Sequence, residues 1–353
     1  MKREVFSSRT RHAHTTTTLL CVLLSVLSIL PLKALQPEPN AVFVRVVDVG
    51  PGLCCVIQMP GNRFAIYDAG DGSAANGKIQ ELIPLGSALE LLVLSHSDSD
   101  HLGSVPFICK QYMVKNVIHS GLKKPRSKGS SEPTLAWSKA MRAIHSEVVD
   151  EHCQEKSLKD SPLTPGQTFT FGDVRLVTVF GLTQPPAAWG FTSSKHTSEF
   201  YNSGSIVMRL DYRGKSVLFC GDTVGRLIDD PATTCIAAER AMVDNNSNVS
   251  INCDVIVAPH HGADNGSSTA FIQATSPTFV IFSAGTLFKH PRASSAKRYL
   301  DNGVAVERMF RTDRGDIQRN GEWTVGTGQG DKAGDDDVDV LIRNSGQIVV
   351  DYR

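Results

Sequence analysis

The sequence lacks a charge excess, because its 353 residues contain 36 lysines and arginines against 36 aspartates and glutamates. This balance excludes a global attraction to nucleic acid or to an anionic membrane, although a local basic patch is compatible with it. Aromatic residues are few, at 7% of the chain, whereas 29 glycines are present. That composition favours a turn-rich α/β protein over a helical bundle. The length allows one large domain or two ordinary ones.

The eight cysteines show no CxxC spacing, which argues against a structural zinc knuckle. Cys54, Cys109 and Cys220 stand in apolar surroundings and are expected to behave as small buried hydrophobes. Cys235 and Cys253 flank a polar insertion, so they can pair if the compartment is oxidising.

The apolar run from Leu19 to Leu30 is too short to span a membrane. It follows a basic stretch and precedes Pro31-Leu32-Lys33-Ala34, which predicts a secretory signal peptide over residues 1–35. A secreted or periplasmic location follows from that interpretation. An uncleaved membrane anchor is the alternative.

The rest of the chain reads as one folded domain over 36–325, a flexible Gly- and Asp-rich linker over 326–337 and a closing hairpin over 338–353. Breakers separate three strands at the start, and the strand-rich opening recurs in the second half. This pattern suits two packed sheets with helices outside them. The strands expected at the start are Val42–Asp48, Leu53–Met59 and Arg63–Asp68.

A cluster of candidate metal ligands follows the apolar run Glu90–Leu94. Imidazoles and carboxylates at nearly alternate positions, on a loop leaving a strand, can converge on one point. Such groups would repel one another or stay poorly solvated unless a cation neutralised them. The alternative is a solvated polar loop. The four residues are His96, Asp98, Asp100 and His101.

Three further loops with ligand-type side chains also follow apolar strands, and strand ends gathered at one sheet edge are where α/β proteins build sites. One carries the single carboxylate of Asp222, for which a turn residue is the alternative. Another carries His260 and His261, and the last carries His290, for which a turn histidine before Pro291 is the alternative.

Taken in order, these motifs resemble the metallo-β-lactamase superfamily, and more narrowly the hydrolase domain of ComEC-type competence proteins. The resemblance runs from about Val44 to Ile317 and implies an α/β fold, the four-layer αββα sandwich, with the site at one sheet edge. Its carriers are Asp48-Val49-Gly50-Pro51-Gly52, Tyr67-Asp68-Ala69-Gly70, Leu94 through Gly103, Asn202 with Ser205, Gly221-Asp222, Pro259-His260-His261-Gly262, His290-Pro291 and Arg311-Thr312-Asp313 before Gly315.

Three departures from the family pattern affect the ligand set. Asp98 replaces the second histidine of HxHxDH, which can favour Mn or Fe relative to Zn. Gly50-Pro51-Gly52-Leu53 replaces Gly-Gln-Gly-Asp and loses a carboxylate. The separate histidine expected before the bridging aspartate is missing, and His196, Asn202 or His260 can supply its place.

By matching positions, the resemblance implies two divalent metal ions, Zn first and Mn or Fe as alternatives. One ion would be held by His96 and Asp98 and the other by Asp100, His101 and His290, with Asp222 between them. Asp100, His260 and His261 are the predicted catalytic residues, although one of the two neighbouring histidines can bind metal while the other protonates a leaving oxygen. Asp48 and Asp68 are expected to form turns or to orient histidines through their ring N–H groups.

The predicted activity is metal-dependent hydrolysis of a phosphodiester, with extracellular nucleic acid or a phospho-headgroup as the substrate that the resemblance favours. No stable membrane partner is expected, and the oligomeric state is left open. The basic loop Lys123–Lys128 suits a polyanion, although a solvated charge run is the simpler interpretation. The alternatives are an acyl hydrolase such as a lactonase or β-lactamase, and a binding protein that keeps the fold without catalysis.

Overall fold

The computed structural model describes residues 34–353 apart from 128–129, 151, 286, 317–318 and 325–335. Residues Ala34–Arg353 form one compact unit. All but the last two residues of the predicted signal peptide, and most of the predicted linker, lie outside the described residues. Within the described part of the chain, none of the helices has the length and apolar character needed to cross a lipid bilayer.

The first sheet joins the two ends of the described chain. Within the described residues it has nine strands, in the order β16-β15-β1-β2-β3-β4-β6-β7, with β5 also paired to β4. The strands are β1 (Val42–Val46), β2 (Cys54–Met59), β3 (Arg63–Ala69), β4 (Ala88–Leu94), β5 (Met113–Val114), β6 (Asn116–His119), β7 (Gln154–Ser157), β15 (Val338–Ile342) and β16 (Ile348–Tyr352). The expected C-terminal hairpin is present, and β15 pairs with β1, so the hairpin is part of this sheet.

The second sheet has seven strands among the described residues, in the order β14-β13-β12-β11-β10-β9-β8. The strands are β8 (Thr168–Phe171), β9 (Val174–Phe180), β10 (Val207–Tyr212), β11 (Lys215–Phe219), β12 (Val255–Val257), β13 (Phe279–Phe282) and β14 (Met309–Arg311). The pairs β11–β12, β12–β13 and β13–β14 are parallel. Because parallel strands end at the same edge, the loops after β11, β12 and β13 lie together.

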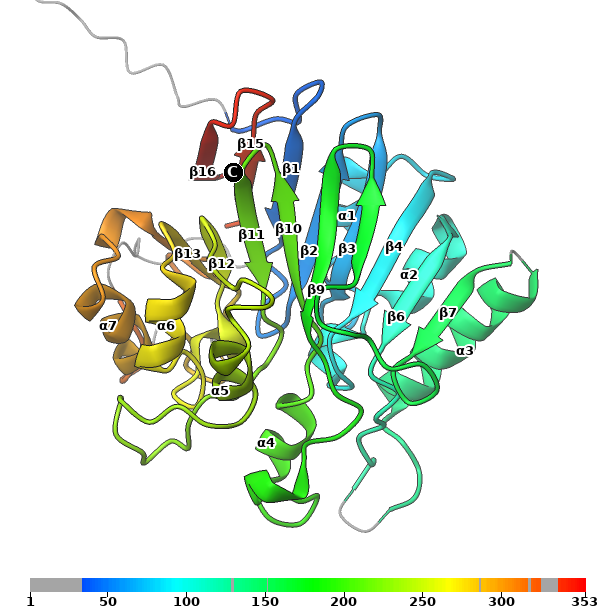
Figure 1. Ribbon diagram of the computed structural model, residues 1–353. Helices are drawn as coiled ribbons and strands as arrows, with labels where there is room; N and C mark the ends of the chain where they lie inside the picture. Colours follow the sequence, from blue (N-terminus) through cyan, green and yellow to red (C-terminus); the bar gives the residue numbers. More distant parts are fainter. Residues whose placement is uncertain (1–33, 128–129, 151, 286, 317–318, 325–335) are drawn as a thin grey trace, which may run out of the picture. The chain divides into compact units, whose positions relative to one another are not determined.

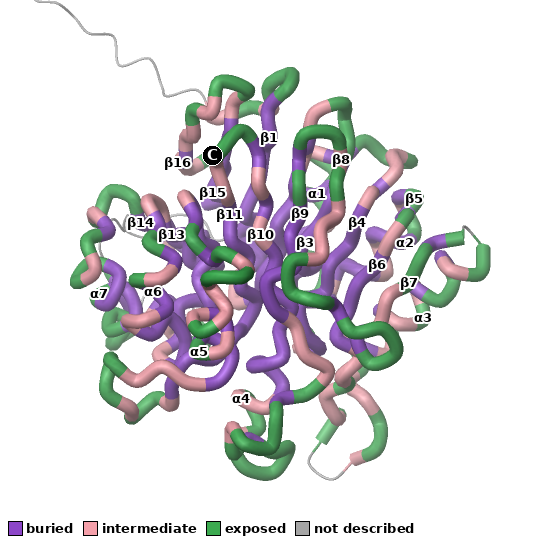
Figure 2. Tube along the Cα trace, viewed as in Figure 1, coloured by how far each residue is buried: buried purple, intermediate pink, exposed green. Residues whose placement is uncertain are grey.

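Three hydrophobic clusters define the layers, and the buried centre is visible in Figure 2. The largest joins inward-facing residues of both sheets, such as Tyr67 and Phe219, whose rings stack at 5.2 Å. A second cluster joins the first sheet to its helices, and a third joins the second sheet to its own (Figure 1). The first group is α1 (Asn76–Leu82), α2 (Val105–Gln111) and α3 (Leu135–Asp150), and the second is α5 (Ala237–Asp244), α6 (Thr269–Thr275) and α7 (Ala293–Asp301). The four-layer αββα sandwich is therefore confirmed.

Several local expectations can be compared with these elements. The three opening strands form within two residues of their expected ends, whereas α5 and the short helix α4 (Thr197–Asn202) were not predicted. Cys54, Cys109 and Cys220 are buried as expected. The possible Cys235–Cys253 disulfide is absent, because both are free thiols and Cys253 is buried in the core against the second sheet.

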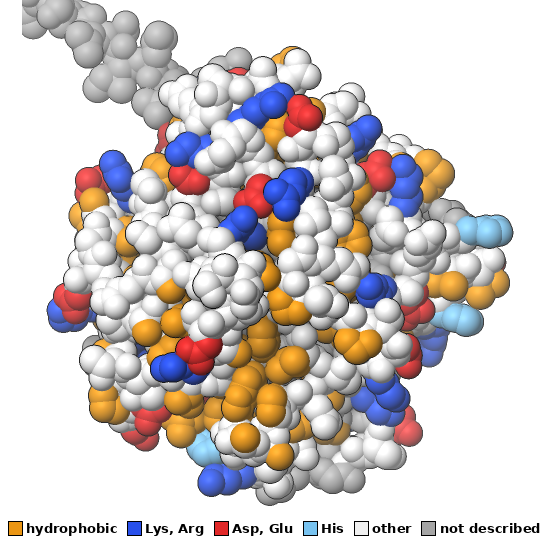
Figure 3. Space-filling view, viewed as in Figure 1, with side chains coloured by type: hydrophobic (Ala, Val, Ile, Leu, Met, Phe, Trp, Pro, Cys, Tyr) orange, Lys and Arg blue, Asp and Glu red, His pale blue; other side chains and the backbone are white. Residues whose placement is uncertain are grey.

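Basic and acidic side chains are interspersed on the face shown in Figure 3.

Candidate metal centre

Asp222 lies at the centre of a group of four imidazole rings. It follows β11 and is 3% exposed. Its Oδ2 atom is 3.7 Å from Nε2 of His96 and 3.7 Å from Nε2 of His260. Its Oδ1 atom is 3.3 Å from Nε2 of His101 and 3.3 Å from Nε2 of His261. The two oxygens of one carboxylate thus face four imidazoles, two on the side of each oxygen.

Asp68, at the end of β3, fixes the orientation of the two histidines that follow β4. Its Oδ2 atom accepts a hydrogen bond from Nδ1 of His101 at 2.8 Å and another from Oγ of Ser95 at 2.7 Å. Since the Ser95 hydroxyl donates its only proton to Asp68, it must accept one from Nδ1 of His96, 2.9 Å away. Both rings therefore carry a proton on Nδ1 and turn Nε2 toward Asp222. The expectation that Asp68 orients a histidine is confirmed.

The two histidines after β12 are oriented in the same way. Nδ1 of His261 donates to the backbone carbonyl of Ser283 at 2.8 Å. Nδ1 of His260 donates to Oδ1 of Asn265 at 2.6 Å, and Nε2 of His260 accepts from the Asn202 amide at 3.2 Å. All four rings thus present Nε2 toward one carboxylate. A hydrogen-bonded Nδ1 is the arrangement that commonly orients metal-binding histidines.

Two of the imidazole nitrogens lie so close together that a proton or a metal ion is needed between them. Nε2 of His101 and Nε2 of His261 are only 3.2 Å apart, and two facing lone pairs repel unless a proton or a metal ion lies between them. Burial disfavours a charged His101, but Asp222 and Asp68 outweigh it and raise its pKa well above the usual value. Burial likewise opposes charging of His261, whose pKa is still raised by Asp222. Burial would raise the pKa of Asp222, yet the surrounding histidines, led by His261, hold it well below its ordinary value.

Orphaned polar atoms test whether these residues fit a divalent metal. Among the described residues, no hydrogen-bond partner is found for the buried Nε2 of His96 or for Oδ1 of Asp222. Burial lowers the pKa of His96 to about 3, with His101 adding to the effect, so this imidazole is neutral. A buried polar atom without a partner is costly, and a neutral imidazole and a carboxylate are ordinary metal ligands. The residues therefore fit a divalent cation.

Two groups of side chains within the described residues bring ligand atoms within 4.8 Å of one another. The first is His96, His101 and Asp222, and the second is Asp100, His101 and His261. Oδ2 of Asp100 lies 3.8 Å from Nε2 of His261. Five residues that sequence analysis selected are thus brought together.

Asp98 and His290 belong to neither group, and their assignment as metal ligands stays a prediction. Oδ2 of Asp98 is bound by Lys124, while its Oδ1 is buried without a hydrogen-bond partner among the described residues. The His290 ring stacks on that of His261 with centroids 6.1 Å apart. Burial lowers the pKa of His290 to about 2, and His260 contributes to the shift.

The other candidates for the missing ligand occupy different places. His196 precedes α4 and its ring contacts Phe191 at a centroid distance of 5.9 Å. Asn202, at the end of α4, lines the pocket beside the site and donates its side-chain amide to Nε2 of His260. His260 itself faces Oδ2 of Asp222. Position therefore favours His260 over the other two.

The backbone of the loops is shaped for this convergence. His260 and His261 both have positive φ angles, +49° and +57°, which are sparsely populated for residues other than glycine. This left-handed turn points successive imidazoles toward the two oxygens of Asp222. Gly221 has φ +52°, and a Cβ atom there would lie 2.8 Å from Cβ of Ser95. The close approach of the β4 and β11 loops therefore requires glycine.

A cavity of about 540 Å³ opens onto the site. Asp98, Asp100 and Asp222 line it, and so do His260, His261 and His290. Ser95 and Lys124 lie in segments that sequence analysis named, but neither was assigned a role at this site, and Asn265 was not singled out. Ser95 and Asn265 act on histidines one and five residues away through loop geometry, and Lys124 reaches Asp98 from a different loop, so sequence periodicity gives no signal for them.

A sequence profile of a known family matches part of this chain. Residues 47–187 match the sequence profile described as the metallo-beta-lactamase superfamily. The match covers less than half of the chain, and it makes this segment similar to that superfamily. The matched segment includes the His96–His101 loop, and the loops with Asp222 and the neighbouring histidines lie beyond it.

Two curated relatives support the narrower resemblance to competence proteins. Competence protein ComA of Neisseria gonorrhoeae is 25% identical over 281 residues, covering 78% of this chain and 32% of the relative. ComE operon protein 3 of Bacillus subtilis (strain 168) is 24% identical over 329 residues, covering 87% of this chain and 36% of the relative. The chain thus spans about a third of the length of these relatives.

Two solved structures similar to this chain have TM-scores below 0.5. The metallo-beta-lactamase fold protein YhfI from Bacillus subtilis has a TM-score of 0.45 at 12% identity, over 78% of this chain and 96% of that one. Zn(2+)-bound PqqB from Methylobacterium extorquens has a TM-score of 0.43 at 10% identity, over 76% of this chain and 97% of that one.

Proposed function

We propose that this protein is a binuclear metal-dependent hydrolase whose substrate is a phosphodiester. The observation that carries the proposal is the division of Asp222, one oxygen facing His96 and His260 and the other facing His101 and His261. A single carboxylate placed between several imidazoles suits two cations a few ångströms apart. Zn is the first candidate, with Mn or Fe as alternatives.

The proposed ligand set follows the two sides of Asp222. On the Oδ2 side we place His96 and His260, together with the unpartnered Oδ1 of Asp98. His260 would then supply the histidine that the family motif lacks in this chain. On the Oδ1 side we place Asp100, His101 and His261. The ring of His290 lies beside that of His261, and sequence position predicts it as a further ligand of the same ion.

Bound divalent cations would acidify a water molecule to a pKa of about 7 and offset negative charge on phosphoryl oxygens. The residues of the chain prepare that chemistry. Asp68, Ser95 and the Ser283 carbonyl hold the imidazoles in the tautomer that leaves Nε2 free. Asp100, whose side chain is 21% exposed, faces the cavity and can accept a hydrogen bond from the attacking water. It is therefore the proposed catalytic carboxylate.

Two further features belong to the proposal. The predicted signal peptide suggests action outside the cytoplasm, in a secreted or periplasmic protein. The resemblance to competence-protein domains favours extracellular nucleic acid as the phosphodiester, although this chain covers only about a third of those relatives.

The test is an assay of purified protein, supplied with Zn or Mn, on bis-p-nitrophenyl phosphate beside nitrocefin and a lactone. We expect hydrolysis of the phosphodiester and little of the other two. Preferential cleavage of nitrocefin or the lactone would replace the proposal with an acyl hydrolase. Absence of all three activities in metal-loaded protein would favour a binding protein.

A further inference from the structure

A loop between β6 and α3 brings a lysine into the metal pocket. The loop folds back on itself through a bridge between Pro125 and Pro133. The backbone N–H of Arg126 donates to the Glu132 carbonyl at 2.7 Å, and that of Thr134 donates to the Lys124 carbonyl at 2.9 Å. Lys124 thus stands at the base of a short hairpin-like turn, where its backbone is fixed.

The side chain of Lys124 is held at the wall of the cavity. Its ammonium group donates to Oδ2 of Asp98 and lies 6.0 Å from the centroid of the Tyr201 ring. The side chain is 30% exposed and that of Asp98 is 16% exposed. Lys124 lines the same cavity as Asp100 and Asp222. An ammonium group has three N–H donors, so two remain after the bond to Asp98.

The charge of the pocket indicates which kind of substrate the two remaining N–H groups of Lys124 bind. Asp98, Asp100 and Asp222 bring three carboxylates to the metal pair, which leaves a pair of divalent cations with little excess charge. A phosphodiester already carries a negative charge, whereas a lactone or a β-lactam ring is uncharged. A fixed ammonium group beside the metal pair therefore favours a phosphodiester over a neutral acyl substrate.

We propose that Lys124, held by Asp98, binds a non-bridging oxygen of the substrate phosphate and so selects phosphodiesters over neutral esters. The inference rests on the proposed function, whose substrate class it explains. It also accounts for Asp98 in place of the usual histidine, because a carboxylate can hold Lys124 through Oδ2 while Oδ1 stays free for a metal.

The experiment compares Lys124→Gln with Lys123→Gln in full-length, metal-loaded protein. Lys123 is the preceding residue, is exposed and does not line the cavity. Loss of a charge-assisted hydrogen bond weakens binding by about 10- to 100-fold. We expect Lys124→Gln to raise KM for bis-p-nitrophenyl phosphate by about 10-fold or more, with a smaller change in kcat. Lys124→Arg should restore much of the affinity, and Lys123→Gln should behave as wild type.

Binding of inorganic phosphate, measured by calorimetry, supplies a readout that needs no turnover. The proposal expects weaker phosphate binding in Lys124→Gln with unchanged metal content and melting temperature. If metal content falls in Lys124→Gln while phosphate binding per loaded site is unchanged, Lys124 only positions Asp98 and the proposal is wrong. Equal phosphate affinity and KM in wild type and Lys124→Gln would also overturn it. If wild type cleaves no phosphodiester but phosphate binding still depends on Lys124, the anion-binding role stands while the proposed function fails.

Discussion

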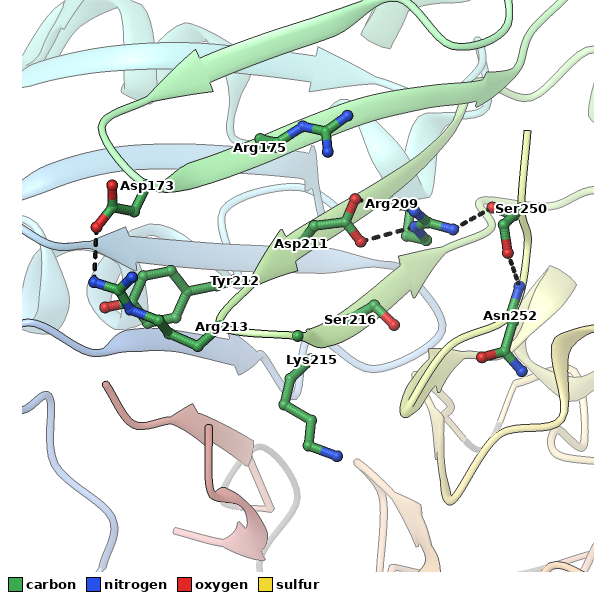
Figure 4. Close-up of a pocket in the computed structure, with 11 residues that line it drawn as sticks. Asp173, Arg175, Arg209, Asp211, Tyr212, Arg213, Lys215, Ser216, Ser250 and Asn252 are labelled. Atoms are coloured by element: carbon green, nitrogen blue, oxygen red, sulfur yellow. Dashed lines mark hydrogen bonds and ion pairs between the residues drawn. The ribbon is translucent and has the colours of Figure 1, made fainter. Parts of the chain in front are cut away.

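Two charged pockets lie at opposite ends of β11, and they differ in how far their polar groups are satisfied. The pocket at the start of β11 has a volume of about 450 Å³ and contains four cations (Figure 4). Three of them are paired, since Arg209 binds Asp211, Arg213 binds Asp173 and Lys215 binds Asp254. The fourth, Arg175, is exposed.

The pocket at the end of β11 has the opposite character. Nε2 of His101 and Nε2 of His261 face each other, and Nε2 of His96 and Oδ1 of Asp222 have no hydrogen-bond partner among the described residues. Both pockets are of similar size and both are rich in charge. The comparison teaches that unsatisfied buried groups, and not charge or volume, identify the site that needs a ligand.

The largest effect is expected from His261→Ala, which removes an imidazole that faces both Asp100 and Asp222. We expect loss of about one metal equivalent and a fall in phosphodiesterase activity of more than about 100-fold. Elemental analysis and kinetics measure the two quantities. His290→Ala is the comparison, and it should lose less metal. A larger metal loss in His290→Ala would restore the ligand set predicted from sequence position.

Asp68→Asn tests whether the hydrogen bonds that Asp68 accepts orient the histidines of the site. The amide nitrogen cannot accept hydrogen bonds, so the variant weakens the bonds from Ser95 and His101 that set the tautomers. Metal affinity should fall by about 10- to 100-fold, measured by competition with a chelator. Asp254→Asn is a matched control, because Asp254 accepts from Ser216 and Lys215 at the far end of β11. Equal metal affinity in Asp68→Asn and wild type would show that the tautomers are set by other means.

Asp48→Asn tests a buried carboxylate that does not support the metal centre. Among the described residues, Asp48 is hydrogen-bonded to no histidine. Burial raises its pKa to about 7, and Asp316 and Asp313 add to the shift. A carboxyl group whose folded pKa is raised binds more protons when folded, so its contribution to stability falls as pH rises from about 4 to about 7. Relative to wild type, Asp48→Asn should therefore gain stability over that range, by at most about 4 kcal/mol.

Denaturant unfolding of both proteins at pH 5 and pH 8 measures this difference. A difference in stability that does not change with pH would show that Asp48 titrates normally in the folded protein.

The smallest effect is expected from Arg213→Gln in the satisfied pocket. Its partner Asp173 is exposed, and exposed ion pairs contribute at most about 1 kcal/mol. Metal content, phosphate binding and KM should equal those of wild type. A loss of activity in Arg213→Gln would mean that the pocket in Figure 4 also serves the reaction, and the contrast between the two pockets would fail.

Much of this architecture was predictable because it depends on local pattern. Apolar strands followed by ligand-bearing loops placed His96, Asp100, His101 and Asp222 at one sheet edge. The division of labour between neighbouring histidines was not predictable, since it depends on the left-handed turn at His260 and His261. The Lys124–Asp98 pair was missed for a similar reason. A basic loop looks like a solvated charge run until the fold brings one of its lysines to a carboxylate 26 positions away.

Metal content measured for wild type and Asp222→Asn, after loading with Zn or Mn and dialysis, tests most directly whether one carboxylate joins two cations. The account predicts about two equivalents in wild type and fewer than about one in Asp222→Asn, with both proteins folded. Less than one equivalent in wild type, or the same content in both proteins, would contradict it.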